Sequence, residues 1–462
     1  MDTVVTRLRS ALDDPDGLIV RDDADALDAT RTDKSGWVAS GRPAALVEAR
    51  TVAHVQATLR TCNDLGVGVV PRGAGTGLAG GANGTDGSAV LSVALMDRIV
   101  EVSADDELAV VEPGVLNGAL NAAVLPLGLR FAPDPASAAI SSVGGNIATN
   151  AGGLRCVKYG VTREAVLGLD VVLADGRLVS TGHRTVKGVT GLDLTALMVG
   201  SEGTLGVIVG ATVRLVPVPS GKPATLGAVF PDVRAAAAAA ADVVHGSERP
   251  STVELLDAAA LAGIAAYLGP DVIAESVGAV PAGGAFLLVE FDGVGAAEAA
   301  RGAEPVLQAA GGTVRRAVDG DERERLLTIR RSFHAAMEAR GQVLIEDVAV
   351  PRSRLADMFD RVAAIGHEHG VAIPTVAHAG DGNLHPNFVF DGDEVPQHVW
   401  DAADALFRAA IELGGTLTGE HGVGVLKRRW IGDELGDDLV TLQRGIRRVF
   451  DPNGILNPGK VL

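Results

Sequence analysis

The chain of 462 residues is too long for a single hydrophobic core, and its length predicts two or three domains. Its formal net charge of -18 argues against nucleic acid as a partner, because phosphate binding needs a basic surface. Only two cysteines are present, which excludes an iron–sulfur cluster held within this chain and a disulfide scaffold.

The N-terminal segment predicts a short lead-in followed by a βαβ unit. Residues 1–40 are charged and mixed, and we expect one or two helices there. AALVEA at 44–49 and VGVVP at 67–71 predict strands. Thr51 is expected to cap the helix between them, and Gly66 to close it.

A long glycine-rich loop, RGAGTGLAGGANGTDGSAV at 72–90, comes next. Within it, GTGLAG at 75–80 satisfies the dinucleotide fingerprint G-x-G-x-x-G, but that fingerprint requires a helix to begin inside the motif. The GGANGTDG that follows does not allow a helix, so we reject a Rossmann interpretation. We expect a loop that offers backbone N–H groups to a phosphate, and the alternative is a merely flexible surface loop.

The rest of the first half continues as mixed helices and strands. Residues 133–153 predict a second long loop of small residues, as expected where backbone packs against a flat ligand. A β-hairpin with an Asp175-Gly176 turn is expected over 167–180. The composition changes near 218–223, where we place a domain boundary.

The second half predicts an antiparallel sheet with helices layered on one face. A single charged helix is expected over 321–340, and a further helix over 436–449 in the C-terminal tail. The expected strands include 224–230, 284–291 and 343–350, and the expected helices include 234–244, 351–369 and 396–413.

The stretch AHAGDGNLHPN at 377–387 places His378 and His385 at the two ends of a flexible turn. One interpretation is that both imidazoles point at the same ion. The plain alternative is a polar loop between two strands with two incidental histidines. The residues of this stretch alone leave both open.

Six collinear motifs make the chain resemble the vanillyl-alcohol oxidase type of FAD enzymes. Within that family it is most similar to the branch of glycolate oxidase flavin subunits, D-lactate dehydrogenases and D-2-hydroxyglutarate dehydrogenases. The motifs are PRGAGTGLAGG (71–81), SSVGGNIATNAGG (141–153), VGSEGTLGVI (199–208), HAGDGNLHPN (378–387), GEHGVG (419–424) and NPGK (457–460).

The resemblance implies an α+β fold. It implies that residues 1–40 form the lead-in and that residues 41–219 form a PCMH-type FAD-binding domain of two α+β subdomains. Residues 220–462 would form a cap or substrate domain of antiparallel sheet and helices, with 420–462 packing back on the FAD domain.

By the same resemblance, FAD is bound noncovalently, because the first loop has Thr76 and no histidine or cysteine for a covalent link. Gly73 to Gly77 would hold the pyrophosphate, 133–153 would line the isoalloxazine, and 199–208 would hold the adenine end. The implied FAD residues are Arg72, Gly73, Ala74, Gly75, Thr76, Gly77, Pro133, Asp134, Ser141, Gly144, Gly145, Asn146, Asn150, Gly152, Gly203, Gly206, Ile208 and Asn457.

The resemblance further implies that His378, His385 and Glu420 bind a divalent metal beside the flavin. Two imidazoles and one carboxylate suit Zn²⁺ or Mn²⁺. The alternative is that the histidines hydrogen-bond a substrate or each other. His421 is expected to be the general base, or else a histidine that orients the carboxylate of Glu420.

Arg330 is expected to bind the substrate carboxylate, with Arg331 as its rival and a solvated helix as the plain alternative. Asn387 is expected to contact the substrate. His334 and Ile345 stand where the hydroxyglutarate enzymes have a threonine and a lysine. This favours a short D-2-hydroxy acid such as D-lactate or glycolate over D-2-hydroxyglutarate.

Three other function classes are weighed against this enzyme: a metal-dependent hydrolase, a flavin-carrying subunit without turnover, and an oxidase that uses O₂. The expected electron acceptor is external, namely a quinone, an electron-transfer flavoprotein or an iron–sulfur subunit. No signal peptide or membrane-spanning run is seen. We therefore expect a cytoplasmic protein, peripheral at most at the inner membrane, with a homodimer left open.

Overall fold

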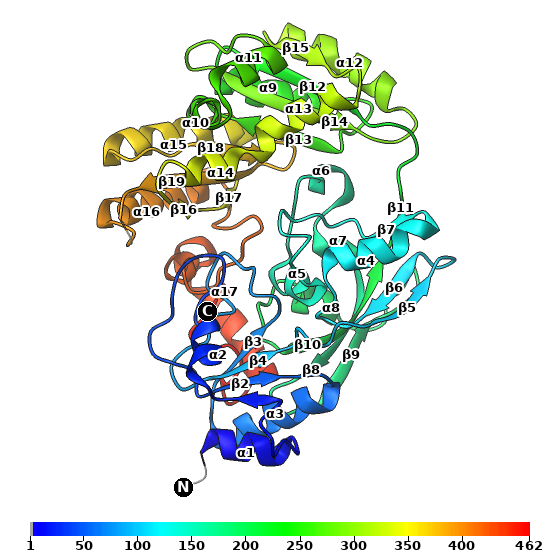
Figure 1. Ribbon diagram of the computed structural model, residues 1–462, viewed down its shortest axis with the longest axis vertical. Helices are drawn as coiled ribbons and strands as arrows, with labels where there is room; N and C mark the ends of the chain where they lie inside the picture. Colours follow the sequence, from blue (N-terminus) through cyan, green and yellow to red (C-terminus); the bar gives the residue numbers. More distant parts are fainter. Residues whose placement is uncertain (1–2, 393) are drawn as a thin grey trace. The chain divides into compact units, whose positions relative to one another are not determined.

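The computed structural model describes residues 3–392 and 394–462, and the chain divides into two compact units. The first unit contains the chain up to residue 152 together with 160–218 and 420–462. The second contains 153–159 and 219–419. The C-terminal segment thus belongs to the same unit as the N-terminus (Figure 1).

The N-terminal sheet of the first unit has the strand order β1-β2-β4-β3, and β2, β4 and β3 run parallel. The predicted βαβ unit is therefore present, but β4 lies between its two strands. Three helices accompany this sheet. The elements are β1 (Val20–Arg21), β2 (Ala45–Glu48), β3 (Val69–Arg72), β4 (Ala89–Ser92), α1 (Val4–Ala11), α2 (Ala24–Ala29) and α3 (Val52–Leu65).

Helix α3 begins and ends as its sequence predicts. The Thr51 side chain accepts the N–H of His54, and Gly66 closes the helix in the left-handed conformation at φ 66°. Val55, Leu59 and Cys62 on its buried face join the core of this sheet.

The second sheet of the first unit is antiparallel, in the order β5-β6-β10-β8-β9. The predicted hairpin is confirmed as β8 and β9, with Gly176 at φ 80° in its turn. The elements are β5 (Ile99–Ser103), β6 (Leu108–Val111), β8 (Val166–Val172), β9 (Leu178–Gly182), β10 (Val207–Arg214), the pair β7 (Leu129–Arg130) and β11 (Val216–Pro217), and the helices α4 (Asn117–Val124), α7 (Thr162–Ala165) and α8 (Leu194–Met198).

The segment 133–153 differs from the long loop that was predicted. It contains the helix α5 (Val143–Thr149), whose N-cap Ser142 accepts the N–H of Gly145. Small residues are needed there for close packing, because a Cβ on Gly144 would come within 2.5 Å of Pro113 Cβ. A short helix α6 (Cys156–Tyr159) follows in the second unit.

The second unit is built on one large antiparallel sheet in the order β15-β12-β14-β13-β18-β19-β16, with β17 pairing β19. Its central strands are buried along their length, which requires cover on both faces. The strands are β12 (Ala224–Phe230), β13 (Thr252–Leu256), β14 (Ala285–Phe291), β15 (Thr313–Arg316), β16 (Gln342–Ile345), β17 (Val348–Ala349), β18 (Thr375–His378) and β19 (Asn383–Phe390).

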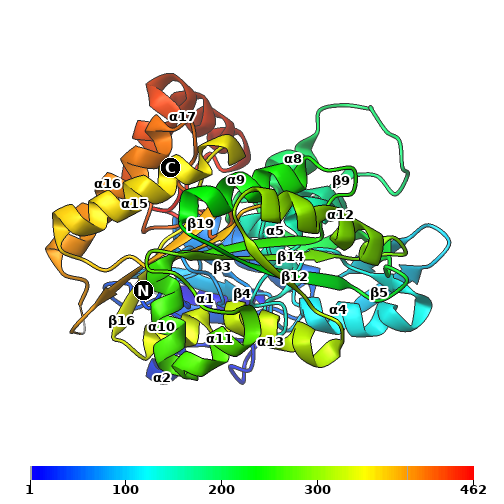
Figure 2. The ribbon, with the colours of Figure 1, turned by 90° about the horizontal axis from the view of Figure 1, so that it is seen from above.

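Helices cover both faces of this sheet, so the prediction of helices on one face is wrong. Figure 2 shows α9 and α12 on one side of β12 and β14, and α10, α11 and α13 on the other. The helices are α9 (Val233–Val244), α10 (Ala258–Leu268), α11 (Pro270–Val277), α12 (Ala296–Ala309), α13 (Gly320–Arg331), α14 (Phe333–Glu338), α15 (Leu355–His369) and α16 (Gln397–Glu412). The α+β class itself is confirmed.

Two predicted helices have different limits in the structure. The charged stretch 321–340 forms α13 and α14 rather than one helix, with Ser332 between them. The tail helix α17 (Ile431–Phe450) is longer than predicted and contains a non-helical residue, Gly436, at φ 72°.

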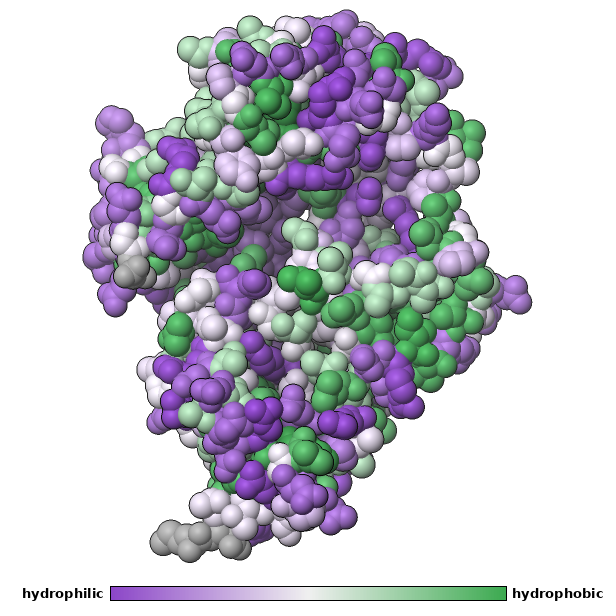
Figure 3. Space-filling model, in the orientation of Figure 1, coloured by the Kyte–Doolittle hydropathy of each residue, from purple (hydrophilic) through white to green (hydrophobic). Residues whose placement is uncertain are grey.

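Exposed apolar side chains gather on one part of the first unit. Figure 3 shows hydrophobic residues together over the region of α4, β5 and β6, where Val100, Leu116, Leu125 and Leu127 are exposed. Within residues 3–392 and 394–462, no single helix is long and apolar enough to cross a membrane.

Candidate functional site

The glycine-rich loop after β3, residues 73–88, contains no helix, which confirms the rejection of a Rossmann motif. Arg72 supports this loop, because its guanidinium donates to the backbone oxygens of Thr32 and Ala82 at 3.0 Å each. Burial lowers the pKa of Arg72. Gly75 adopts φ 70°, and a Cβ there would lie 2.4 Å from Arg72 Nη2. The predicted cofactor residues Gly73, Ala74, Thr76 and Gly77 follow along the loop, half-buried or exposed.

The glycine-rich loop and the start of α5 approach each other closely. A Cβ on Gly73 would lie only 2.7 Å from Ser142 Oγ. The residues around Ser142, including the predicted Ser141, Gly144, Gly145 and Asn146, are buried or half-buried. Two segments that the family resemblance assigned to one cofactor thus lie close together in the fold.

Several buried polar atoms of this region have no hydrogen-bond partner among the residues that the structure describes. They include Ser141 Oγ, Asn146 Nδ2, Asn83 Oδ1 and Asn457 Oδ1. Buried polar groups normally find a partner in protein, water or ligand. Uncharged donors and acceptors of this kind fit a cofactor with many neutral polar groups.

The tail of the chain is tied to the glycine-rich loop. Asn457 Nδ2 donates to the backbone oxygens of Glu202 at 2.7 Å and Gly81 at 3.1 Å. Lys460, the last residue of the motif NPGK, had no predicted role and donates from Nζ to the oxygens of Gly81 at 2.9 Å and Asn83 at 2.6 Å. Burial lowers the pKa of Lys460 to about 7.

The remaining predicted cofactor residues also lie in the first unit. Pro133 accepts from Asn117 Nδ2 at 3.0 Å through its backbone oxygen, and Asn150 ends α5 at φ 51°. Gly203, at φ 73°, stands against the ring of Pro71. The others are Asp134 and Gly152 on the segments flanking α5, Gly206 just before β10, and Ile208 on β10.

The two histidines of the turn lie on one face of the β18–β19 hairpin. His378 ends β18, and His385 pairs with Val376, two residues before His378, so the two side chains are diagonal neighbours. Their ring centroids are 4.9 Å apart. Glu420 is the first residue of the C-terminal segment 420–462, and its carboxylate and the two imidazoles place their ligand atoms within 4.8 Å of one another.

Each histidine has a buried carboxylate behind it. Glu254 on β13 is the cross-strand partner of His378, and its Oε1 lies 2.7 Å from His378 Nδ1. Asp347 Oδ1 lies 4.0 Å from His385 Nδ1. A carboxylate behind a metal-ligating histidine is a frequent arrangement, because it fixes the ring and its tautomer.

Glu254 also holds the predicted substrate arginine. Its Oε2 accepts from Arg330 Nε at 2.5 Å, and both side chains are buried. Burial acts to raise the pKa of Glu254, but the charges of His378 and Arg330 outweigh it and lower the pKa. The rival Arg331 is half exposed and pairs with Glu324 at 2.6 Å. Of the two arginines, Arg330 is the one tied to the histidine cluster.

Asn387 lies on the same strand face as His385. It is fully buried, and its Nδ2 donates to the His385 backbone oxygen at 2.9 Å. Its Oδ1 has no hydrogen-bond partner in the described part of the chain. Ile345 is its cross-strand neighbour. His334 lies on α14, half-buried beside Phe333, and His421 is half-buried in the segment after Glu420.

Glu254 was missed by the sequence reasoning. A single glutamate in the apolar strand TVELL was a usable signal, because charged residues are rarely buried without a partner. The signal is not specific, since Glu290 in AFLLVEF has the same appearance and pairs with Arg323 instead.

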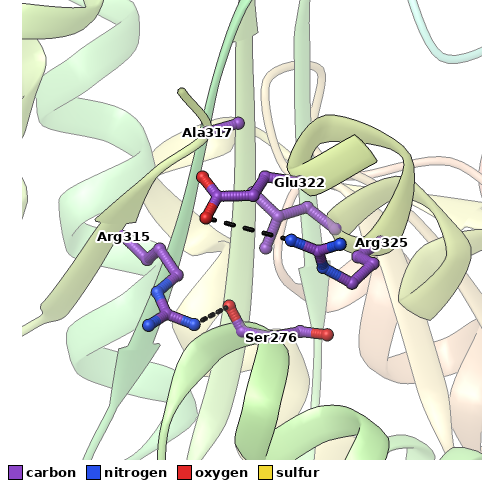
Figure 4. Close-up of a pocket in the computed structure, with 6 residues that line it drawn as sticks. Ser276, Arg315, Ala317, Glu322 and Arg325 are labelled. Carbon is purple, nitrogen blue, oxygen red and sulfur yellow. Dashed lines mark hydrogen bonds and ion pairs between the residues drawn. The ribbon is translucent and has the colours of Figure 1, made fainter. Parts of the chain in front are cut away.

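A small pocket in the second unit contains none of the predicted residues. It lies between α11, β15 and α13, where Arg315 contacts Ser276 and Glu322 faces Arg325 (Figure 4). Its volume of about 10 Å³ has room for no more than a water molecule. We assign no ligand to it.

Comparisons with known proteins bear on both units. Residues 222–461 match the C-terminal domain of FAD-linked oxidases, and residues 43–182 match an FAD-binding domain. Glycolate oxidase subunit GlcD of Bacillus subtilis is 39% identical over 91% of this chain and 89% of its own length. D-lactate dehydrogenase of Archaeoglobus fulgidus is 36% identical over 94% and 96%. The solved structure of p-cresol methylhydroxylase covers 99% of this chain and 96% of its own with a TM-score of 0.79, and at 18% identity this likeness concerns the fold alone.

Proposed function

Because the chain belongs to the family of FAD-linked oxidases, we propose that it oxidises a short D-2-hydroxy acid, of the D-lactate or glycolate type, to the 2-oxo acid. The chain is an FAD-dependent oxidoreductase with a PCMH-type FAD-binding domain. The substrate, the metal and the residue roles are the parts that we propose.

The residues of the first unit fit noncovalent FAD. The loop 73–88 offers backbone groups without a helix, and Ser141, Asn146 and Asn457 present buried polar atoms that need partners. That loop contains Thr76 but no histidine or cysteine, so it has no side chain for a covalent link to the flavin. When bound, FAD supplies the hydride acceptor of the reaction.

The observation that carries the proposal is the convergence of His378, His385 and Glu420, with Arg330 joined to His378 through Glu254. Alcohol oxidation needs a site for the hydroxyl oxygen and a cation for the acid group. The ligand atoms of the cluster would bind the hydroxyl oxygen through a cation, and the Arg330 guanidinium would bind the acid group. Glu254 contacts both Arg330 and His378 and so connects the two.

Two imidazoles and a carboxylate suit Zn²⁺ or Mn²⁺ and leave coordination positions for substrate oxygens. Such a cation would lower the pKa of a hydroxyl bound to it. We assign the proton that leaves this hydroxyl to His421, which follows Glu420 directly in the chain. The other role for His421 is to orient the Glu420 carboxylate.

Arg330 would bind the substrate carboxylate. Its Nε–H serves Glu254, and the guanidinium has further N–H donors in a planar fork that matches a carboxylate. The buried Asn387 Oδ1 would accept a hydrogen bond from the substrate hydroxyl before the reaction begins. Ile345 beside Asn387 offers an apolar surface, which suits a short side chain better than a second carboxylate.

Two alternatives retain the same chemistry. The first is a D-2-hydroxyglutarate dehydrogenase, in which His334 would contact the far end of the substrate. The second is the flavin-carrying subunit of a larger glycolate oxidase, which is favoured by the subunit names of the relatives from Bacillus subtilis and Escherichia coli. In that case the iron–sulfur relay would lie on another chain.

Anaerobic mixing of the FAD-loaded protein with a panel of D- and L-2-hydroxy acids tests the proposal. We expect D-lactate or glycolate to bleach the flavin absorbance, and L-lactate to leave it unchanged. Faster bleaching by D-2-hydroxyglutarate would move the assignment to that substrate. Absence of bleaching with every acid of the panel would contradict the proposed reaction.

A further inference from the structure

Glu254 uses both oxygens of one carboxylate for two different functional side chains. Oε1 lies 2.7 Å from Nδ1 of His378, and Oε2 lies 2.5 Å from Nε of Arg330. The Glu254 side chain has no exposed surface, and that of His378 is 7% exposed, so water does not compete for these contacts.

The contact with His378 determines the tautomer of that imidazole. An ionised carboxylate only accepts hydrogen bonds, so the proton of His378 must lie on Nδ1. In the neutral imidazole the lone pair is then on Nε2, the atom that a metal would bind. The cross-strand pairing of Glu254 with His378 fixes the ring in addition, because both residues are in neighbouring strands of a buried sheet.

The contact with Arg330 fixes the guanidinium at the end of α13. Arg330 is the next-to-last residue of that helix, and a long side chain there would otherwise adopt several rotamers. Because the Nε–H donates to Glu254, which lies on β13, the orientation of the planar guanidinium depends on that strand as well as on the helix.

We infer that Glu254 is a positioning residue that links cation binding to binding of the substrate carboxylate. It holds His378 in the metal-binding tautomer and Arg330 in one orientation, so that the two binding sites form as one unit. This inference rests on the proposed function, and it adds a role to a residue that neither binds the metal nor contacts the substrate.

Glu290 provides a matched control within the same sheet. It is buried on β14, beside β13, and forms a 2.7 Å ion pair with Arg323. It also accepts from Thr225 Oγ1 at 2.9 Å. Glu290 therefore has the burial and the arginine of Glu254 but contacts neither histidine of the cluster in the described part of the chain.

The test compares Glu254→Gln, Glu254→Asp and Glu290→Gln as FAD-loaded full-length proteins. Zn²⁺ and Mn²⁺ affinities are measured by chelator competition, and KM and kcat are measured with the substrate that bleaches the flavin. We expect Glu254→Gln to weaken metal binding by about 10- to 100-fold, as is typical for loss of a carboxylate behind a ligating histidine, and to raise KM at the same time. Glu254→Asp should fall between wild type and Glu254→Gln.

We expect Glu290→Gln to lower the melting temperature while leaving the metal affinity within about twofold of wild type. Wild-type metal affinity in Glu254→Gln, with lowered stability alone, would reduce Glu254 to a structural ion pair and overturn the inference. If Glu254→Gln does not fold, unchanged metal affinity in Glu254→Asp overturns it. If the wild type binds neither cation, the inference fails together with the metal-assisted part of the proposed function, whereas flavin bleaching would still report on the oxidation itself.

Discussion

Two buried glutamates, Glu202 in the first unit and Glu254 in the second, are held in opposite ways. Burial raises the pKa of Glu202, whose carboxylate accepts from the backbone N–H groups of Val423 and Gly424 at 2.7 and 2.9 Å. Burial acts on Glu254 as well, but a neighbouring imidazole and guanidinium outweigh it and lower its pKa. Glu202 thus hydrogen-bonds to backbone N–H groups, whereas Glu254 contacts the side chains of His378 and Arg330.

The same difference runs through the two regions. The first unit shapes its cofactor loops with glycines, backbone hydrogen bonds and neutral polar side chains. The charged side chains of Arg72 and Lys460 donate hydrogen bonds to backbone oxygens of these loops. The second unit gathers titratable side chains on one face of a sheet. We therefore expect substitutions in the cofactor loops to change cofactor binding and stability, and substitutions around the two histidines, Glu420 and His421 included, to change the chemistry.

The largest effect is expected for His378→Ala. Removing one of two imidazoles should abolish stoichiometric metal binding while FAD stays bound, because the FAD loops belong to the first unit. A metal ion contributes several kcal/mol to a transition state, so flavin reduction should slow by roughly 10³-fold or more. Metal content by elemental analysis and stopped-flow absorbance are the measurements. Full metal content in this variant would contradict the assignment of His378 as a metal ligand.

His421→Ala should come next. A positioned base typically contributes about 10²- to 10⁴-fold, and this loss should appear in kcat with the metal still bound. In the wild type, the rate of flavin reduction should fall toward low pH, where the base is protonated. This fall should be absent in the variant. Near-wild-type turnover would leave His421 only the role of orienting Glu420.

Arg330→Lys and Arg331→Lys form a pair with a smaller expected effect. Lysine keeps the charge that Glu254 needs but lacks the planar fork, so Arg330→Lys should raise KM by roughly tenfold without loss of FAD. Arg331 is half exposed and paired with Glu324, so its variant should match wild type. A raised KM in Arg331→Lys alone would transfer the carboxylate site to that residue.

The smallest effect on the reaction is expected for Lys460→Met, whose effect should appear as a pH dependence of stability. Burial lowers the pKa of Lys460 to about 7 from its model-compound value of 10.5. Between these pH values the unfolded chain binds more protons than the folded one, so wild-type stability should rise with pH by up to about 1.4 kcal/mol per pH unit. The variant should lack this rise, whereas its metal affinity should stay unchanged. Melting curves from pH 7 to 9 measure it, and parallel profiles for both proteins would contradict the assignment.

Local signals predicted much of the fold. Thr51 and Gly66 bound α3 as expected, and Gly176 turns the hairpin, because caps and turns depend on a few adjacent residues. The helix in 143–149 was missed, since glycine-rich sequence argues against a helix unless tight packing requires it. The placement of β4 between β2 and β3 depends on long-range pairing that no local pattern reports.

The residues proposed as metal ligands were predictable from the sequence, but the residues that support them were not. His378, His385 and Glu420 belong to motifs, and the structure brings their ligand atoms together. Glu254 looks ordinary in sequence, as a glutamate in an apolar strand, and Lys460 stands in the motif NPGK with no role assigned to it there. Their roles arise from contacts with residues at least 76 positions away, which only the folded chain brings together.

The most direct measurement is flavin reduction before and after removal of the divalent cation. The FAD-loaded protein is treated with a chelator, freed of it, mixed anaerobically with the D-2-hydroxy acid that bleaches it, and then supplied with Zn²⁺ or Mn²⁺. We expect the chelated protein to keep its flavin spectrum and bleach roughly 10³-fold more slowly, and one of the two cations to restore the rate. Equal bleaching rates before and after complete metal removal would contradict metal-assisted oxidation at His378, His385 and Glu420.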